Sequence, residues 1–145
     1  MVIPDINLLV YAYNKSSSFH GESRLWWENL LNTGIPVGLP WVTALGFVRI
    51  MTDIRIMKRP MNPLKALSHV KKWLEAPSVR ILEPGLKHLE IMDELINITR
   101  IAGGLTTDLH IASLAIEFHG EVHSNDRDFA RFPNLRFFNP LEKSR

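Results

Sequence analysis

The chain contains no cysteine. This absence excludes a disulfide framework, a thiolate metal site and a cysteine nucleophile, and it is compatible with a reducing, cytoplasmic setting. No apolar run approaches the ~20 residues that a membrane-spanning helix needs, so we expect no membrane association. The first residues carry an acid, Asp5, and no early basic region, which is unlike a signal peptide.

The chain also has little excess charge of either sign. Its 17 Lys and Arg against 15 Asp and Glu leave a formal net charge of +2, too small to indicate a nucleic-acid partner by itself. The 145 residues, 46% of them hydrophobic, fit one globular domain over residues 1–145, because no linker or internal repeat divides them. Function must therefore be argued from the positions of particular residues.

Short apolar runs alternate along the chain with patterns of helical period. We expect strands at residues 2–4, 35–39, 79–82, 121–124 and 136–138. We expect helices at residues 22–31, 42–52, 63–75, 84–101 and from Thr106 or Thr107, as the cap, to Gly120. Strands separated by helical crossovers pair in parallel, so the pattern predicts an α/β sandwich.

Three acids fall where such a fold gathers its ligands. Asp5 directly follows the first expected strand, Asp126 follows the fourth, and Asp108 lies in the first turn of the last long helix. Each acid alone could be a turn residue or a helix cap. Together they predict a carboxylate cluster, and a divalent cation such as Mg²⁺ or Mn²⁺ relieves the repulsion within one. That combination is typical of phosphodiester hydrolysis.

The segments PDINLLVYA, TTDLHIASLA and SNDRDFARFPNLRFFNPL resemble the PIN domain and, more closely, the VapC toxins of type II toxin–antitoxin pairs. The resemblance extends over essentially the whole chain, including PVGLPWVTALGFVRI. It implies a three-layer sandwich, with a parallel sheet of about five strands flanked by helices. It also implies an Mg²⁺- or Mn²⁺-dependent endoribonuclease that cuts tRNA, rRNA or mRNA, forms a homodimer and is silenced by a VapB-type antitoxin.

The resemblance assigns roles to the residues of these motifs. It implies that Asp5, Asp108 and Asp126 are the catalytic, metal-binding acids. Supporting roles are implied for Asn7, Ser124, Asn125 and Asp128. For Asp128 an ion pair with a neighbouring arginine remains an equal alternative.

One position departs from the PIN pattern. Many PIN nucleases have a glutamate on the helix after the second strand, and the alignment of WVTALGFVRI puts Gly46 there. A site with three acids could bind a single cation more weakly, and Glu22 is a poor substitute. The departure keeps open a catalytically weak or inactive RNA- or protein-binding module, and a housekeeping RNA-processing nuclease is a further alternative.

Basic residues occur near these acids and in the segment 53–61. We expect Arg49, Arg127 and Arg131 to contact the RNA backbone, although a solvated surface is the simpler interpretation of such charges. Among the four tryptophans, Trp41 lies closest to the expected site and is the best candidate for stacking on a base.

Overall fold

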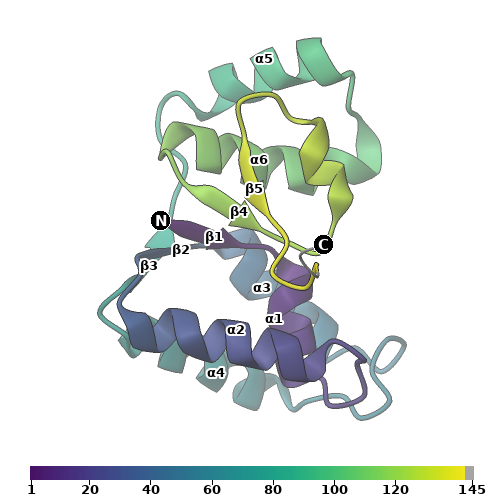
Figure 1. Ribbon diagram of the computed structural model, residues 1–145. Helices are drawn as coiled ribbons and strands as arrows, with labels where there is room; N and C mark the ends of the chain where they lie inside the picture. Colours follow the sequence, from purple (N-terminus) through teal and green to yellow (C-terminus); the bar gives the residue numbers. More distant parts are fainter. Residues whose placement is uncertain (143–145) are drawn as a thin grey trace.

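The computed structural model describes residues 1–142 (Figure 1). Its elements, in chain order, are β1 (Val2–Pro4), α1 (Ile6–Tyr13), α2 (His20–Thr33), β2 (Val37–Pro40), α3 (Trp41–Met51), α4 (Pro63–Glu75), β3 (Val79–Leu82), α5 (His88–Thr99), the 3-10 helix η1 (Gly103–Leu105), α6 (Thr106–Glu117), β4 (Glu121–His123), the 3-10 helix η2 (Arg127–Arg131) and β5 (Arg136–Phe138).

The five strands form one sheet in the order β3-β2-β1-β4-β5, and every neighbouring pair is parallel. The predicted parallel α/β fold is therefore confirmed, and each predicted strand lies within two residues of its observed bounds. The register pairs Pro4 of β1 with His123 of β4. The residues that follow these two strands consequently begin side by side, at the carboxyl edge of the sheet.

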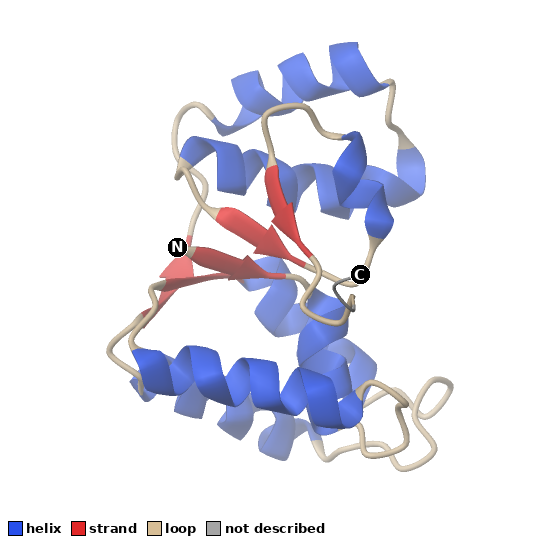
Figure 2. Cartoon of the chain, viewed as in Figure 1, coloured by secondary structure: helices blue, strands red, loops and turns tan. Residues whose placement is uncertain are grey.

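Helices cover both faces of the sheet, as expected for three layers (Figures 1 and 2). One core cluster joins the sheet to α1, α2, α3 and α4, and a second joins it to α5 and α6. The rings of Phe47 and Trp27 pack on Trp73 at centroid distances of 4.8 and 5.4 Å in the first cluster. Of the helices within residues 1–142, none has the length and apolar character to cross a membrane.

Helix α1 is an element that the sequence pattern did not reveal. Its residues INLLVYAY are almost all apolar, so they show no alternation of polar and apolar faces. The helix lies against both α2 and α3 and buries Leu8, Leu9, Val10 and Ala12. A helix enclosed in this way needs no polar face, which explains why periodicity could not identify it.

Helices α2 and α3 begin within two residues of their predicted starts, and two other helix starts differ in a way that the structure explains. Helix α5 begins at His88 rather than at residue 84, and the preceding loop is fixed by Gly85, whose N–H donates to Glu117 Oε1 at 3.0 Å. Neither Thr106 nor Thr107 caps α6, because Leu105 occupies the N-cap position and Thr106 Oγ1 instead donates to the carbonyl of Gly103. The start of α4 is as predicted, with Asn62 accepting from the N–H of Leu64.

Candidate metal centre

Asp5 stands at the junction of β1 and α1. Its N–H donates to the carbonyl of His123 on the neighbouring strand at 2.9 Å. Its carboxylate accepts two hydrogen bonds, one on Oδ1 from the Ile6 N–H at 2.8 Å and one on Oδ2 from Ser124 Oγ at 2.7 Å. Asp5 thus caps α1 while facing the chain that leaves β4.

Ser124 is the centre of a hydrogen-bond network that joins the two strand ends. Its side chain is fully buried, and its Oγ accepts from Asn7 Nδ2 at 3.3 Å and from the Asp126 N–H at 2.9 Å while donating to Asp5. Asn7 Oδ1 in turn accepts from the N–H of Asn125 at 3.4 Å. Asp5, Asn7, Ser124 and Asn125 form what we call the strand-end network, and the structure brings all four predicted residues together.

A second group of acids lies beside this network. Asp126 is the N-cap of η2, and its Oδ1 accepts from the Asp128 N–H at 2.9 Å. Asp108 projects from the first turn of α6. Carboxylate oxygens of Asp108, Asp126 and Asp128 all lie within 4.8 Å of one another, and we call these three residues the carboxylate cluster.

The membership of this cluster differs from the expected trio of acids. Asp128, rather than Asp5, is the third member, and Asp5 lies beside it. Asp128 also forms an ion pair with Arg131, since the Arg131 Nη2 lies 3.4 Å from the Asp128 Oδ1. Asp128 therefore combines the two roles considered for it, support of the acidic site and an ion pair with a neighbouring arginine. The sequence spacing hinted that Asp128 belongs to the cluster. Asp128 lies two residues beyond Asp126, so both side chains occupy the same turn.

The protonation of the acids reflects this crowding. Burial, followed by the negative charges of Asp5, Asp126 and Asp128, raises the pKa of Asp108 to about 7. Burial also raises the pKa of Asp5, but the hydrogen bonds from Ser124 and Ile6 oppose that rise. The site therefore holds more negative charge than its own hydrogen bonds stabilise.

The donor chemistry of the site fits a divalent cation. The cluster offers three carboxylates and, within residues 1–142, is the one group of at least three His, Cys, Asp or Glu side chains close enough to share an ion. Hard oxygen ligands of this kind suit Mg²⁺ and Mn²⁺. A cation would also relieve the repulsion that raises the pKa of Asp108.

Gly46 of α3 faces the side chain of Ile6. A Cβ atom at this glycine would lie 2.5 Å from Ile6 Cδ1, closer than two carbon atoms can approach. The place where many PIN nucleases have a glutamate is thus occupied by an apolar contact between α1 and α3. Glu22 lies in the exposed first turn of α2 and does not belong to the cluster.

The arginines expected to contact RNA are spread over the surface. Arg127 pairs with Glu142 at 3.2 Å, Arg131 pairs with Asp128, and Arg49 is exposed in the last turn of α3. Trp41 is 47% exposed, and its Nε1 donates to Glu83 Oε1 at 3.3 Å. Contact of these side chains with RNA stays a prediction.

Comparison with known proteins agrees with this fold and places the chain in a family. The PIN domain family matches residues 2–135. Ribonuclease VapC33 of Mycobacterium tuberculosis is 38% identical over 143 residues, which cover 99% of this chain and 100% of that protein. Ribonuclease VapC37 of the same species is 35% identical over 140 residues, 97% of each chain.

Solved structures give the same architecture. VapBC2 from Rickettsia felis, bound to a DNA fragment from its promoter, superposes with a TM-score of 0.66 at 22% identity over 96% of this chain and 98% of that one. VapBC-1 from nontypeable Haemophilus influenzae gives a TM-score of 0.69 at 15% identity over 98% and 100% of the two chains. At these identities the likeness supports the fold.

Proposed function

This chain belongs to the PIN domain family and is related along its whole length to the VapC ribonucleases, and we propose that it is an endoribonuclease that acts as the toxin of a VapBC pair. The observation that carries the proposal is the carboxylate cluster at the carboxyl edge of the sheet. Ligands of open α/β sheets bind at this edge. RNA, in the form of tRNA, rRNA or mRNA, is the proposed substrate.

We propose Mg²⁺ or Mn²⁺ as the cofactor, held by Asp108, Asp126 and Asp128 with Asp5 beside them. A divalent cation supplies positive charge that activates water and offsets the charge developing on the phosphate. The strand-end network orients Asp126, because Ser124 accepts from its N–H, and holds Asp5 from two sides. None of the acids needs to act as a nucleophile, so hydrolysis by water accounts for the chemistry.

We propose a VapB-type antitoxin as the protein partner and a homodimer as the form of the toxin. Relatives that carry the VapC name and similar folds solved as VapBC and FitAB assemblies support the antitoxin, whereas the homodimer rests on the family resemblance alone. A small gene for a DNA-binding protein next to the gene for this chain would support a toxin over a housekeeping nuclease.

The test is cleavage of total cellular RNA by the purified protein, free of any co-expressed partner, with Mg²⁺ or Mn²⁺ and with an EDTA control. Asp5→Asn and Asp126→Asn should abolish the fragments. Asp93→Asn, a change on an exposed part of α5, should leave them unchanged. Discrete fragments that need both the metal and the two acids establish the nuclease.

The rival function is an inactive RNA-binding module, and the apolar contact at Gly46 is the observation that favours it. RNA that stays intact under every condition while still bound by the protein would support this rival. Such a result would contradict the proposed function.

A further inference from the structure

A groove of about 530 Å³ lies at the far end of α1 from the carboxylates. It is bounded by the residues that end α1, by the end of α3 and by the loop that leads into α4. The loops that form it lie at the lower right of Figure 1, on the side toward which the strands point. Its volume falls in the range of ordinary ligand sites.

Four cations line this groove, and we call it the basic groove. They are Lys15, Lys58, Arg59 and Lys65, and all four are exposed. No aspartate or glutamate is among the lining residues, and none of the four cations forms an ion pair within residues 1–142. Their charge is therefore available to an anionic ligand.

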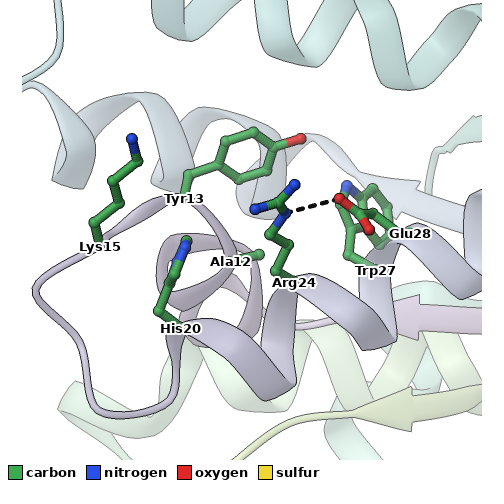
Figure 3. Close-up of a pocket in the computed structure, with 7 residues that line it drawn as sticks. All are labelled: Ala12, Tyr13, Lys15, His20, Arg24, Trp27 and Glu28. Carbon is green, nitrogen blue, oxygen red and sulfur yellow. Dashed lines mark hydrogen bonds and ion pairs between the residues drawn. The ribbon is translucent and has the colours of Figure 1, made fainter.

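The neighbouring cavity between α1 and α2 shows the contrast (Figure 3). It measures about 200 Å³ and also contains cations, but Arg24 Nε donates to Glu28 Oε1 at 2.8 Å across it. An internal ion pair already uses that charge. The basic groove is the place where cations gather without such a partner.

The floor of the basic groove is apolar. Met51 and Met57 are buried and Met61 is half-buried, and Tyr13 lies beside them among the lining residues. Thioethers are polarizable and make favourable contacts with aromatic rings. A cationic rim over such a floor matches a polymer that carries phosphates on one side and flat aromatic bases on the other.

Helix α1 connects the groove to the carboxylates. It is capped by Asp5, which lies beside the carboxylate cluster, and its eight residues span about 12 Å from there to Tyr13 at the groove. A single strand of RNA spans this distance in a few nucleotides. A strand with its scissile phosphate at the carboxylate cluster can therefore place a neighbouring segment in the groove.

We infer that the basic groove binds single-stranded RNA beside the scissile phosphate and so contributes to the choice of substrate. The inference rests on the proposed function, which makes RNA the substrate. Phosphates pair with the exposed cations, and one or more bases lie on the methionine floor. Proteins generally hold single strands by a charged groove with a surface that contacts the bases, and here methionine thioethers stand where aromatic side chains are more usual.

The test is RNA binding in EDTA, where no cleavage occurs. A labelled single-stranded oligoribonucleotide of about 12 nucleotides lies within the site sizes of known single-strand grooves. Lys58→Gln/Arg59→Gln should weaken its binding roughly 10- to 30-fold at about 0.1 M salt and should lower the slope of log Kd against log salt by about 1.4, because two phosphate contacts are lost. The second pair, Lys15→Gln/Lys65→Gln, lies in other segments of the chain. It should weaken RNA binding and lower the salt dependence by the same amounts.

The matched control is Lys71→Gln/Lys87→Gln, which removes the same charge from exposed positions that do not line the groove. Thermal unfolding identifies any pair that fails to fold. Groove pairs that bind RNA as tightly as the control would overturn the inference, as would a wild type that does not bind the oligonucleotide. Groove pairs that lose affinity for an acidic peptide and not for RNA would overturn it in favour of a protein partner.

Binding in EDTA also separates this inference from the proposed function. If the wild type never cleaves RNA but the groove pairs still lose affinity, the proposed function fails, and binding of single-stranded RNA by the groove stands without its link to cleavage. If the wild type cleaves RNA and the groove pairs bind it normally, the inference fails and the nuclease stands.

Discussion

The carboxyl edge of the sheet holds two polar groups of opposite character. In the strand-end network, Asp5 receives a hydrogen bond on each carboxylate oxygen and Ser124 takes part in three. In the carboxylate cluster, Asp108 has no hydrogen bond that lowers its pKa, and burial followed by three neighbouring negative charges raises it. The first group is satisfied by its own hydrogen bonds, whereas in the second only Asp128 has a cationic partner, Arg131, and no positive charge acts on Asp108.

Asp126 belongs to both groups and shows how they cooperate. Its N–H is held by Ser124, and its carboxylate is one of the three that converge. The network therefore acts as a frame, and the cluster acts as a set of ligands. Rigid support behind a reactive set of side chains is the arrangement that metal sites generally require.

The largest predicted effect on stability and metal binding comes from a change at Ser124, the centre of the strand-end network. Ser124→Ala removes three hydrogen bonds and leaves Asp5 buried with one donor fewer. We expect a loss of about 2–4 kcal/mol in the free energy of unfolding, because buried groups are left unsatisfied. We also expect a roughly 10- to 100-fold loss in metal affinity, as is usual for residues that orient ligands. Chemical denaturation and metal titration measure the two effects.

Ser113→Ala is the matched control for this prediction. Ser113 is equally buried, but its Oγ donates only to the carbonyl of Leu109 in its own helix. We expect a cost of less than about 1 kcal/mol, since such a bond duplicates the helix's own bonding. Equal costs for Ser113→Ala and Ser124→Ala would contradict the role of Ser124 as the centre of the frame.

The contact between Gly46 and Ile6 gives the next prediction. Gly46→Glu should not restore a fourth ligand, because its Cβ would overlap Ile6 Cδ1. Overpacking of this kind costs about 1–3 kcal/mol, which a lower thermal midpoint would reveal. The double variant Ile6→Ala/Gly46→Glu removes the overlap and should recover part of the loss. A Gly46→Glu protein as stable as the wild type would show that the Ile6 side chain moves aside at little cost, so that this contact does not exclude a larger residue.

The cluster itself predicts a dependence of stability on pH in metal-free protein. The pKa of Asp108 is about 7 in the folded state against an ordinary value of 3.8, so the folded state retains a proton that the unfolded state releases between these values. The stability that this proton provides is fully present below about pH 4 and is lost as the pH rises through about 7.

Asp108→Asn should therefore stabilise the metal-free protein at pH 8 and change little at pH 4. Asp108 is only half-buried, so the expected gain is about 1–2 kcal/mol after allowance for solvent screening. Denaturation in EDTA across this range, with Asp93→Asn as the exposed control, measures it. A gain that is equal at both ends of the range would rule out the ionisation of Asp108, disfavoured by burial and by the neighbouring charges, as its cause.

Much of the site could be predicted from the sequence because parallel strands align their carboxyl ends. Asp5 and Ser124 had to meet once β1 and β4 were neighbours, and the motif residues Asn7 and Asn125 came with them. The inclusion of Asp128 in the cluster could not be settled in advance. It depends on the turn of η2 and on the position of Asp108 at the start of α6, which only the packed structure fixes.

The features that sequence reasoning missed have physical reasons. Helix α1 is apolar on all sides because other helices enclose it, so it carries no periodic signal. The basic groove joins Lys15 to Lys58, Arg59 and Lys65, which are distant in the chain, and charges in separate segments give no pattern. Only the segment 53–61 was visible as locally basic.

The most direct test is to measure the binding of Mn²⁺ to the partner-free protein. The electron paramagnetic resonance signal of the free ion reports how much Mn²⁺ remains unbound. The wild type should bind Mn²⁺ and release it to excess Mg²⁺. Asp126→Asn should weaken the binding at least tenfold, since it removes one of the converging carboxylates, and Asp93→Asn should not change it. An Asp126→Asn protein that binds Mn²⁺ as tightly as the wild type would contradict the assignment of the carboxylate cluster as the metal site.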